Sequence, residues 1–232
     1  MKRFLISKGL LVIPNLRSSH KKPKPQGGGL AVIIFLTLSL FFLNILGLIE
    51  IDQFLFFLVP GLFVAFIGFL DDFIGINPLI RLSVHFFSAF IGLYIIGTFP
   101  IISFYDQEFD LGIVGLGIGL LYVVWMTNLY NFMDGIDGFV SLEAISVLCC
   151  FSFISYFVFS DPTFSFLLAV ICSTIFGFLL LNFPKSQIFL GDVGSCFLGI
   201  ITALISIHSS QNNPELFWSW LILLGFFIVD ST

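Results

Sequence analysis

Two asparagines and two aspartates stand close together at the end of a long apolar run, in the stretch NLYNFMDGIDG. Burying an unpaired amide in an apolar environment costs about 2 to 7 kcal/mol, and burying an unpaired carboxylate costs more. A cation with a polar ligand would offset this cost for Asn128, Asn131, Asp134 and Asp137. The simpler alternative is a polar interfacial loop between two membrane helices, and this stretch alone leaves both interpretations open.

Two adjacent carboxylates, Asp71 and Asp72, end an earlier apolar run, and Arg81 follows them after a Gly-x-x-Pro turn. Adjacent carboxylates repel each other, and this repulsion raises the pKa of one of them unless a cation intervenes. A divalent metal ion, a general base that awaits a proton, or both would explain the pair. The alternative is a helix end that carries two solvated acids.

Asp192 belongs to a third polar segment, GDVGS, at the start of another apolar run. Glycines near a helix N-terminus leave backbone N–H groups accessible, which suits phosphate binding. The alternative is that Asp192 or Ser195 simply caps the helix.

A basic segment, Ile13–Leu30, precedes the first long apolar run, and its prolines exclude a regular helix. Its positive charge predicts a clamp for the phosphate groups of a substrate. The alternative is a juxtamembrane patch that orients the protein and contacts anionic lipid. The residues predicted for the clamp are Arg17, His20, Lys21 and, from the later segment, Arg81.

The elements that must position these residues are membrane helices. The chain is 58% hydrophobic and 10% charged, whereas soluble domains are about 45–50% apolar and about 25% charged. Most of its apolar runs approach the roughly 17–25 residues that a helix needs to cross a bilayer, and they do not alternate as barrel strands do. We expect an all-α polytopic bundle, a single integral membrane domain over 1–232 with a basic loop at 13–29 and about eight spans. The predicted spans are roughly 30–49, 53–70, 82–99, 113–130, 139–158, 164–182, 194–208 and 216–229.

If the spans alternate in direction, all nine Lys and Arg residues fall on one side and only acids fall on the other. The positive-inside rule makes the basic side cytoplasmic. All the polar segments described above lie on that side, so we expect them to form one active site. Oxygen ligands without cysteine or paired histidine favour Mg²⁺ or Mn²⁺ over zinc. A basic loop beside such a cation predicts phosphate or diphosphate chemistry, and the membrane suggests a phosphorylated lipid as one substrate.

Four motifs, RSSHKKPKPQGGG, DDFIGINPLIR, NLYNFMDGIDG and FLGDVGS, follow one another between the expected spans. In order and wording they resemble the polyprenyl-phosphate N-acetylhexosamine-1-phosphate transferases, the glycosyltransferase 4 family, and most closely its O-antigen and lipopolysaccharide branch. The resemblance implies Mg²⁺-dependent transfer of a sugar 1-phosphate from a UDP-N-acetylsugar to undecaprenyl phosphate, with release of UMP. It places the enzyme in the bacterial inner membrane with its site on the cytoplasmic face, allows a homodimer, and implies no nucleic-acid partner.

The resemblance also implies roles for single residues. Asp71 matches the general base that deprotonates or orients the lipid phosphate, and Asp72 its supporting neighbour. Asp134 matches a further acid of the catalytic group. Asp192 and Asn131 match the metal-binding carboxylate and the amide beside it.

On the nucleotide side, the resemblance implies that Asp137 contacts the uracil, that Phe189 stacks on it, and that Gly135 lies next to it. Two departures from the family pattern are visible. The family has a further span before the RSSH motif and a histidine-containing loop nearer the C-terminus, so we expect this chain to be a fragment without the first span and the C-terminal spans. The family also usually has Arg where Gln26 stands.

Two alternatives remain from the residues themselves. A non-enzymatic transporter would place polar residues near the midplane of broken helices, whereas here they gather at one face. A CDP-alcohol phosphotransferase also uses Mg²⁺ and aspartates, but no Ala-Arg dipeptide of its signature follows Gly135 or Gly138.

Overall fold

The computed structural model describes residues 11–14, 23–97, 99–105 and 107–231. These residues form a helical bundle, which confirms the predicted all-α class. Its helices are α2 (Gly29–Ile45), α3 (Ile51–Ile74), α4 (Pro78–Ile96), α5 (Gly112–Met133), α6 (Phe139–Phe157), α7 (Pro162–Asn182), α8 (Asp192–Asn212), α9 (Leu216–Leu223) and α10 (Gly225–Ser231). Two short hairpins accompany them, β1 (Leu11–Val12) with β2 (Lys24–Pro25) and β3 (Ile102–Phe104) with β4 (Gln107–Phe109).

Each predicted span overlaps helix in the described chain, although the helix bounds differ from the predicted ones. Six of the described helices, α3 to α8, are long and apolar enough to cross a membrane, and α2 is a shorter apolar helix. The run predicted as a continuous span at 216–229 is instead two short helices that meet at Leu224. The break precedes Gly225, and glycine is among the weakest helix formers because it loses the most backbone freedom.

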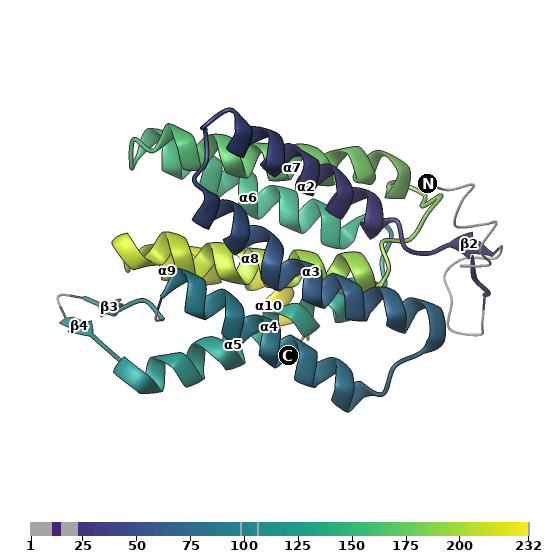
Figure 1. Ribbon diagram of the computed structural model, residues 1–232, viewed down its shortest axis with the longest axis horizontal. Coiled ribbons are helices and arrows are strands. Elements are labelled where there is room, and N and C mark those ends of the chain that lie inside the picture. Colours follow the sequence, from purple (N-terminus) through teal and green to yellow (C-terminus); the bar gives the residue numbers. More distant parts are fainter. Residues whose placement is uncertain (1–10, 15–22, 98, 106, 232) are drawn as a thin grey trace.

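Helix α8 lies at the centre of the bundle. In Figure 1 it runs between a layer of α2, α6 and α7 and a layer that contains α3, α4 and α5. Glycines allow its close contacts: a Cβ added at Gly68 of α3 would lie 2.7 Å from the Asp192 carbonyl oxygen, and one added at Gly199 would lie 2.8 Å from the Met126 carbonyl oxygen. The N-terminus of α8 is therefore held tightly against α3.

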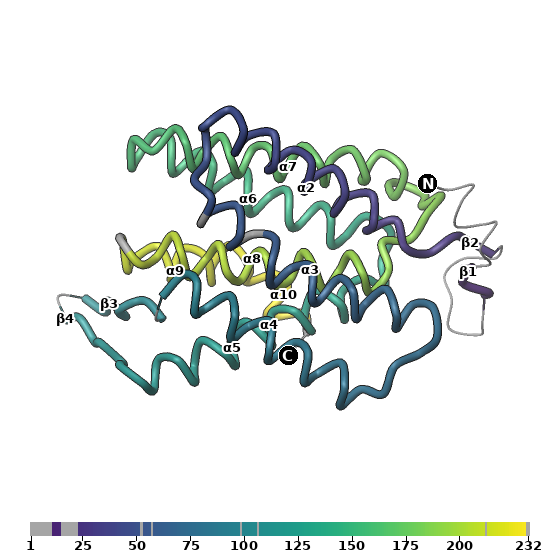
Figure 2. The backbone as a smooth tube through the Cα atoms, viewed as in Figure 1, coloured from purple at the N-terminus to yellow at the C-terminus, as the bar shows by residue number. Residues whose placement is uncertain are grey.

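The two ends of the bundle differ in charge. Figures 1 and 2 show the β1–β2 hairpin, the α3–α4 turn and the start of α8 at one end, and the β3–β4 hairpin at the other. The basic residues of the described chain, Lys24, Arg81 and Lys185, belong to the first end. The acids of the β3–β4 region, Glu108 and Asp110, belong to the second. This arrangement agrees with the predicted partition of charge, and it gathers the polar motifs at the basic end.

Candidate active site

The carboxylate of Asp72 lies against the N-terminus of α8. Its Oδ1 accepts the backbone N–H of Asp192 at 3.0 Å and the side-chain amide of Gln26 at 2.5 Å. Its Oδ2 accepts the N–H of Val193 at 3.4 Å. The residue at the N-cap position, Gly191, has no side chain to satisfy these donors, and a Cβ there would lie 2.5 Å from Asp72 Oδ2. Asp72 therefore caps α8 from another helix.

Arg81 joins two carboxylates that are far apart in the sequence. Its Nη1 lies 2.5 Å from Asp71 Oδ2 and 2.9 Å from Asp192 Oδ2. The other oxygen of Asp71 accepts the N–H of Ile76 at 2.6 Å, in the turn after α3. Asn77 caps α4 by accepting the Leu79 N–H at 2.9 Å. This cap fixes where α4 begins, and the position of α4 places Arg81 next to both carboxylates.

The end of α5 brings the NLYNFMDGIDG stretch to the same place. Asn131 donates to Ser195 Oγ at 3.1 Å, and that hydroxyl donates to the Gly191 carbonyl at 3.1 Å. The Asn131 amide also lies beside the Asp192 carboxylate. Asp134 follows the last turn of α5, and its pKa lies well above its usual value because it is desolvated and because Asp192 carries negative charge nearby. A backbone hydrogen bond from Gly191 acts in the opposite direction without offsetting this shift.

A second polar cluster lies beside the first. Asp137 Oδ2 accepts the Ser186 N–H at 3.0 Å and pairs with Lys24 Nζ at 3.4 Å. Lys24 also donates to Ser186 Oγ at 2.7 Å, and its Nζ lies 4.9 Å from the centre of the Phe189 ring. Partial burial would raise the pKa of Asp137, but the Ser186 hydrogen bonds and the Lys24 charge outweigh it and hold the pKa below its usual value.

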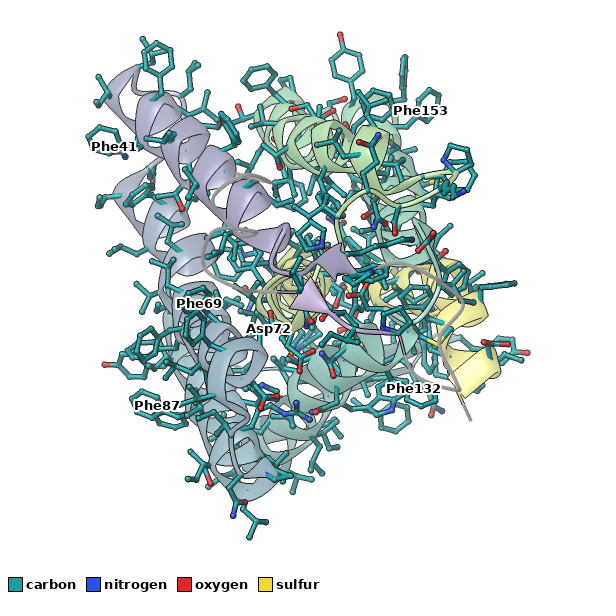
Figure 3. All side chains as sticks on the ribbon, turned by 90° about the vertical axis from the view of Figure 1, so that its right-hand side faces the viewer. Phe41, Phe69, Asp72, Phe87, Phe132 and Phe153 are labelled. Carbon is teal, nitrogen blue, oxygen red and sulfur yellow. The ribbon has the colours of Figure 1, made fainter. Side chains whose placement is uncertain are left out.

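Both clusters lie at the end of the bundle that faces the viewer in Figure 3. Asp72 lies near the middle of this view, among many oxygen and nitrogen atoms, while the labelled Phe41, Phe87 and Phe153 lie toward the rim. Phe41, Phe87, Phe132 and Phe153 are exposed on the bundle surface. An apolar surface around a polar centre is the arrangement expected where a membrane helix bundle opens toward water.

The structure brings most of the predicted site residues together. Asp71, Asp72, Arg81, Asn131 and Asp192 form the first cluster, with Asp134 close enough to be influenced by its charges. Asp137 and Phe189 meet in the second cluster through Lys24. Gly135 is exposed, and a Cβ built there would meet no atom of the described structure within 4 Å. The predicted clamp residues Arg17, His20 and Lys21 lie outside the described residues.

Sequence reasoning missed the contacts of three residues that shape the site. Gln26 departs from the family pattern, yet its side-chain amide donates to Asp72. Ser186 had no assigned role, yet it bonds both Asp137 and Lys24. Asn182 accepts the Gly138 N–H at 2.7 Å and donates to the Ile188 carbonyl at 2.9 Å. The sequence signal for these two hydrogen bonds of Asn182 is an Asn at the end of an apolar run.

The donor set suits a hard divalent cation that is shared with a substrate. Asp71 and Asp192 both pair with Arg81, and Asp72 accepts the backbone N–H of Asp192. Among the described residues, no three His, Cys, Asp or Glu side chains converge to hold a metal ion on their own. Mg²⁺ commonly takes one or two protein carboxylates and completes its shell with substrate phosphates and water. Asp192 and the neighbouring amide of Asn131 fit this pattern.

Comparison with known proteins agrees with the geometry. A model of glycosyl transferase family 4 matches residues 54–210, which include both aspartate motifs and the start of α8. A probable undecaprenyl-phosphate N-acetylglucosaminyl 1-phosphate transferase of Bacillus subtilis is 29% identical over 100% of this chain and 65% of its own length. A phospho-N-acetylmuramoyl-pentapeptide-transferase of Streptococcus pneumoniae is 29% identical over 91% of this chain and 66% of its own. The chain thus spans about two thirds of the length of these relatives, and it belongs to glycosyl transferase family 4.

Proposed function

We propose that the protein transfers an N-acetylhexosamine 1-phosphate from a UDP-sugar to undecaprenyl phosphate or a related polyprenyl phosphate, and releases UMP. The observation that carries this proposal is the Arg81 bridge between Asp71 of α3 and Asp192 of α8, at the basic end of a membrane bundle. It assembles the carboxylates of two family motifs into one group. The names of these two relatives support the same class of reaction, since each refers to the transfer of a phospho-sugar group.

Asp192 and Asn131 would hold a Mg²⁺ ion, or Mn²⁺ in its place, together with the diphosphate of the nucleotide sugar. When bound, the ion supplies positive charge against the negative charge that develops on the departing UMP. The raised pKa of Asp134 is consistent with this assignment, because burial and then the negative charge of Asp192 disfavour the Asp134 anion until a cation is present.

Asp71 is the candidate base for the lipid phosphate. In the reaction, an oxygen of the lipid phosphate bonds to the phosphorus that carries the sugar, and the bond from that phosphorus to the oxygen of UMP breaks. Arg81 pairs with both Asp71 and Asp192, so it sets where the Asp71 carboxylate lies relative to Asp192. Asp72 uses both oxygens to fix the start of α8, so its contribution is to position Asp192.

The second cluster would receive the nucleotide. Asp137 offers a carboxylate oxygen and Phe189 an aromatic face, and these two groups suit a planar base that carries an N–H donor. Gly135 leaves open space in the adjoining loop. Arg17, His20 and Lys21 stay predicted as a clamp for the substrate phosphates.

The sugar and the pathway belong to the proposal as well. N-acetylglucosamine is the first candidate, because the Bacillus subtilis relative, whose name specifies this sugar, matches the whole of this chain. The O-antigen role that the motif wording suggested stays a prediction, since neither relative's name refers to it. A site on the cytoplasmic face of the bacterial inner membrane follows from the basic end of the bundle. Family membership disfavours the transporter and the CDP-alcohol phosphotransferase alternatives.

The exchange of labelled UMP into UDP-N-acetylglucosamine tests the proposal. Full-length protein in detergent should catalyse this exchange only when undecaprenyl phosphate and Mg²⁺ are both present. UDP-N-acetylgalactosamine in a parallel reaction tests the choice of sugar. A folded protein that exchanges UMP into neither UDP-sugar would contradict the assignment.

A further inference from the structure

The ammonium group of Lys24 lies on the surface that the nucleotide base would need. Its Nζ lies 4.9 Å from the centre of the Phe189 ring, 3.4 Å from Asp137 Oδ2 and 2.7 Å from Ser186 Oγ. The side chain of Lys24 is only 15% exposed, and that of Asp137 is 26% exposed. An ammonium group above an aromatic ring and beside a carboxylate is a stable, partly desolvated arrangement.

A planar base and this ammonium group need the same two partners. A base that stacks on Phe189 and also donates an N–H to Asp137 Oδ2 would compete with Lys24 Nζ, because the ammonium group lies over the Phe189 ring and pairs with the same oxygen. The pKa of Asp137 lies below its usual value, because its hydrogen bonds from Ser186 and the charge of Lys24 outweigh its desolvation, so the carboxylate is ionised and available as an acceptor.

We infer that Lys24 is an internal ligand of the base-binding surface and lowers the affinity of the protein for its nucleotide substrate. This inference rests on the proposed function, in which Asp137 and Phe189 face the base. The nucleotide displaces the Lys24 side chain when it binds, and the strength of the Lys24 contacts sets part of the free energy of binding.

The backbone around Lys24 allows this displacement without any larger movement. Pro25 accepts the Phe189 N–H at 2.8 Å, and Gly28 donates to the Phe189 carbonyl at 2.8 Å. Lys24 itself pairs with Val12 in the β1–β2 hairpin. The main chain on both sides of Lys24 is thus tied to the site, whereas the long Lys24 side chain is attached only by contacts that a rotamer change would release.

Two substitutions should change nucleotide affinity in opposite directions. Lys24→Met keeps an apolar stem and removes the charge, so uridine should bind about 3- to 10-fold more tightly, as expected for the loss of one cation–π contact and one partly exposed ion pair. Lys24→Arg places a planar cation on Phe189 that stacks better than an ammonium group, so uridine should bind more weakly. A purely structural role of Lys24 predicts weaker binding for both variants.

The measurement is isothermal titration of the full-length protein in detergent with uridine and with UMP. Uridine is the decisive probe because it is neutral and carries no phosphate. The Lys24 charge does not attract it over a long range, so loss of that charge cannot weaken its binding in this way. Lys185→Met is the matched control, since Lys185 precedes Ser186 in the same loop but is exposed. Its uridine affinity should equal that of the unsubstituted protein.

Three results separate this inference from the proposed function. Tighter uridine binding by Lys24→Met, together with weaker binding by Lys24→Arg, supports it. Unchanged or weaker binding by Lys24→Met, in a protein that still exchanges UMP, overturns it and leaves the proposed function in place. A folded protein that binds neither uridine nor UMP overturns both.

Discussion

Asp72 accepts the backbone N–H of Asp192 at 3.0 Å, although 120 residues separate the two in the chain. The same carboxylate accepts the N–H of Val193, so the first turn of α8 depends on a side chain from α3. This contact fixes where Asp192 stands, and Asp192 is the residue that Arg81 connects to Asp71.

Loss of the Asp72 cap should weaken the protein. Asp72→Ala should lower the free energy of unfolding by about 1 to 3 kcal/mol, because it leaves N–H donors at the start of α8 without an acceptor. Asp72→Asn keeps one acceptor oxygen and should cost less. Thermal unfolding in detergent measures both, with Glu108→Ala at the opposite end as a control. Equal losses for the Ala and Asn variants would argue against the capping role.

Removal of the Arg81 guanidinium should expose a repulsion between two carboxylates. Arg81→Met should destabilise the protein by about 1 to 3 kcal/mol and abolish exchange, because Asp71 and Asp192 lose the charge between them. The double variant Arg81→Met with Asp71→Asn should regain part of the stability but none of the activity. The double-mutant cycle on unfolding free energy checks this prediction, and strictly additive losses would contradict it.

Asp192→Asn should lower UMP exchange by about 10²-fold or more, since it removes the proposed metal-binding carboxylate. The amide still accepts a hydrogen bond from Arg81, so thermal stability should change little. Titration of the residual activity with Mg²⁺ provides the check: the variant should need a higher Mg²⁺ concentration for half-maximal activity. An unchanged Mg²⁺ requirement would remove Asp192 from the metal site. Addition of EDTA should abolish exchange by the unsubstituted protein.

The Asp137 cluster predicts a pH-dependent contribution to stability. The pKa of Asp137 in the fold lies below its usual value of 3.8, so the folded state binds the Asp137 proton less readily than the unfolded state does. The contribution is therefore fully present above the usual pKa and is lost as the pH falls through the lower value of the folded state. The difference in Tm between the unsubstituted protein and Asp137→Asn should stay constant from about pH 7 to pH 5 and shrink below about pH 4. A constant difference down to pH 3 would contradict this prediction.

The sequence by itself determined the helices of this protein and the end of the bundle at which its polar motifs gather. In a bilayer the backbone must satisfy its hydrogen bonds within each span, so a continuous apolar run has few alternatives to a helix. The run predicted at 164–182 is α7, Pro162–Asn182, and the described lysines and arginines share one end as predicted. The break at Leu224 was missed, because the apolar character continues through it while only the local backbone geometry changes.

The tertiary structure alone decided which polar residues meet and what each one does for its neighbours. No local pattern states that Arg81 reaches Asp192 across 111 residues, that Asp72 caps α8, or that Lys24 covers Phe189. These contacts depend on how α3, α4, α5 and α8 pack, and that packing is set by small residues such as Gly68 and Gly199, which let backbones approach where larger side chains would not fit. The residue types limited the chemistry to carboxylates, amides and cations, and the packing of the helices gave each of them its partner.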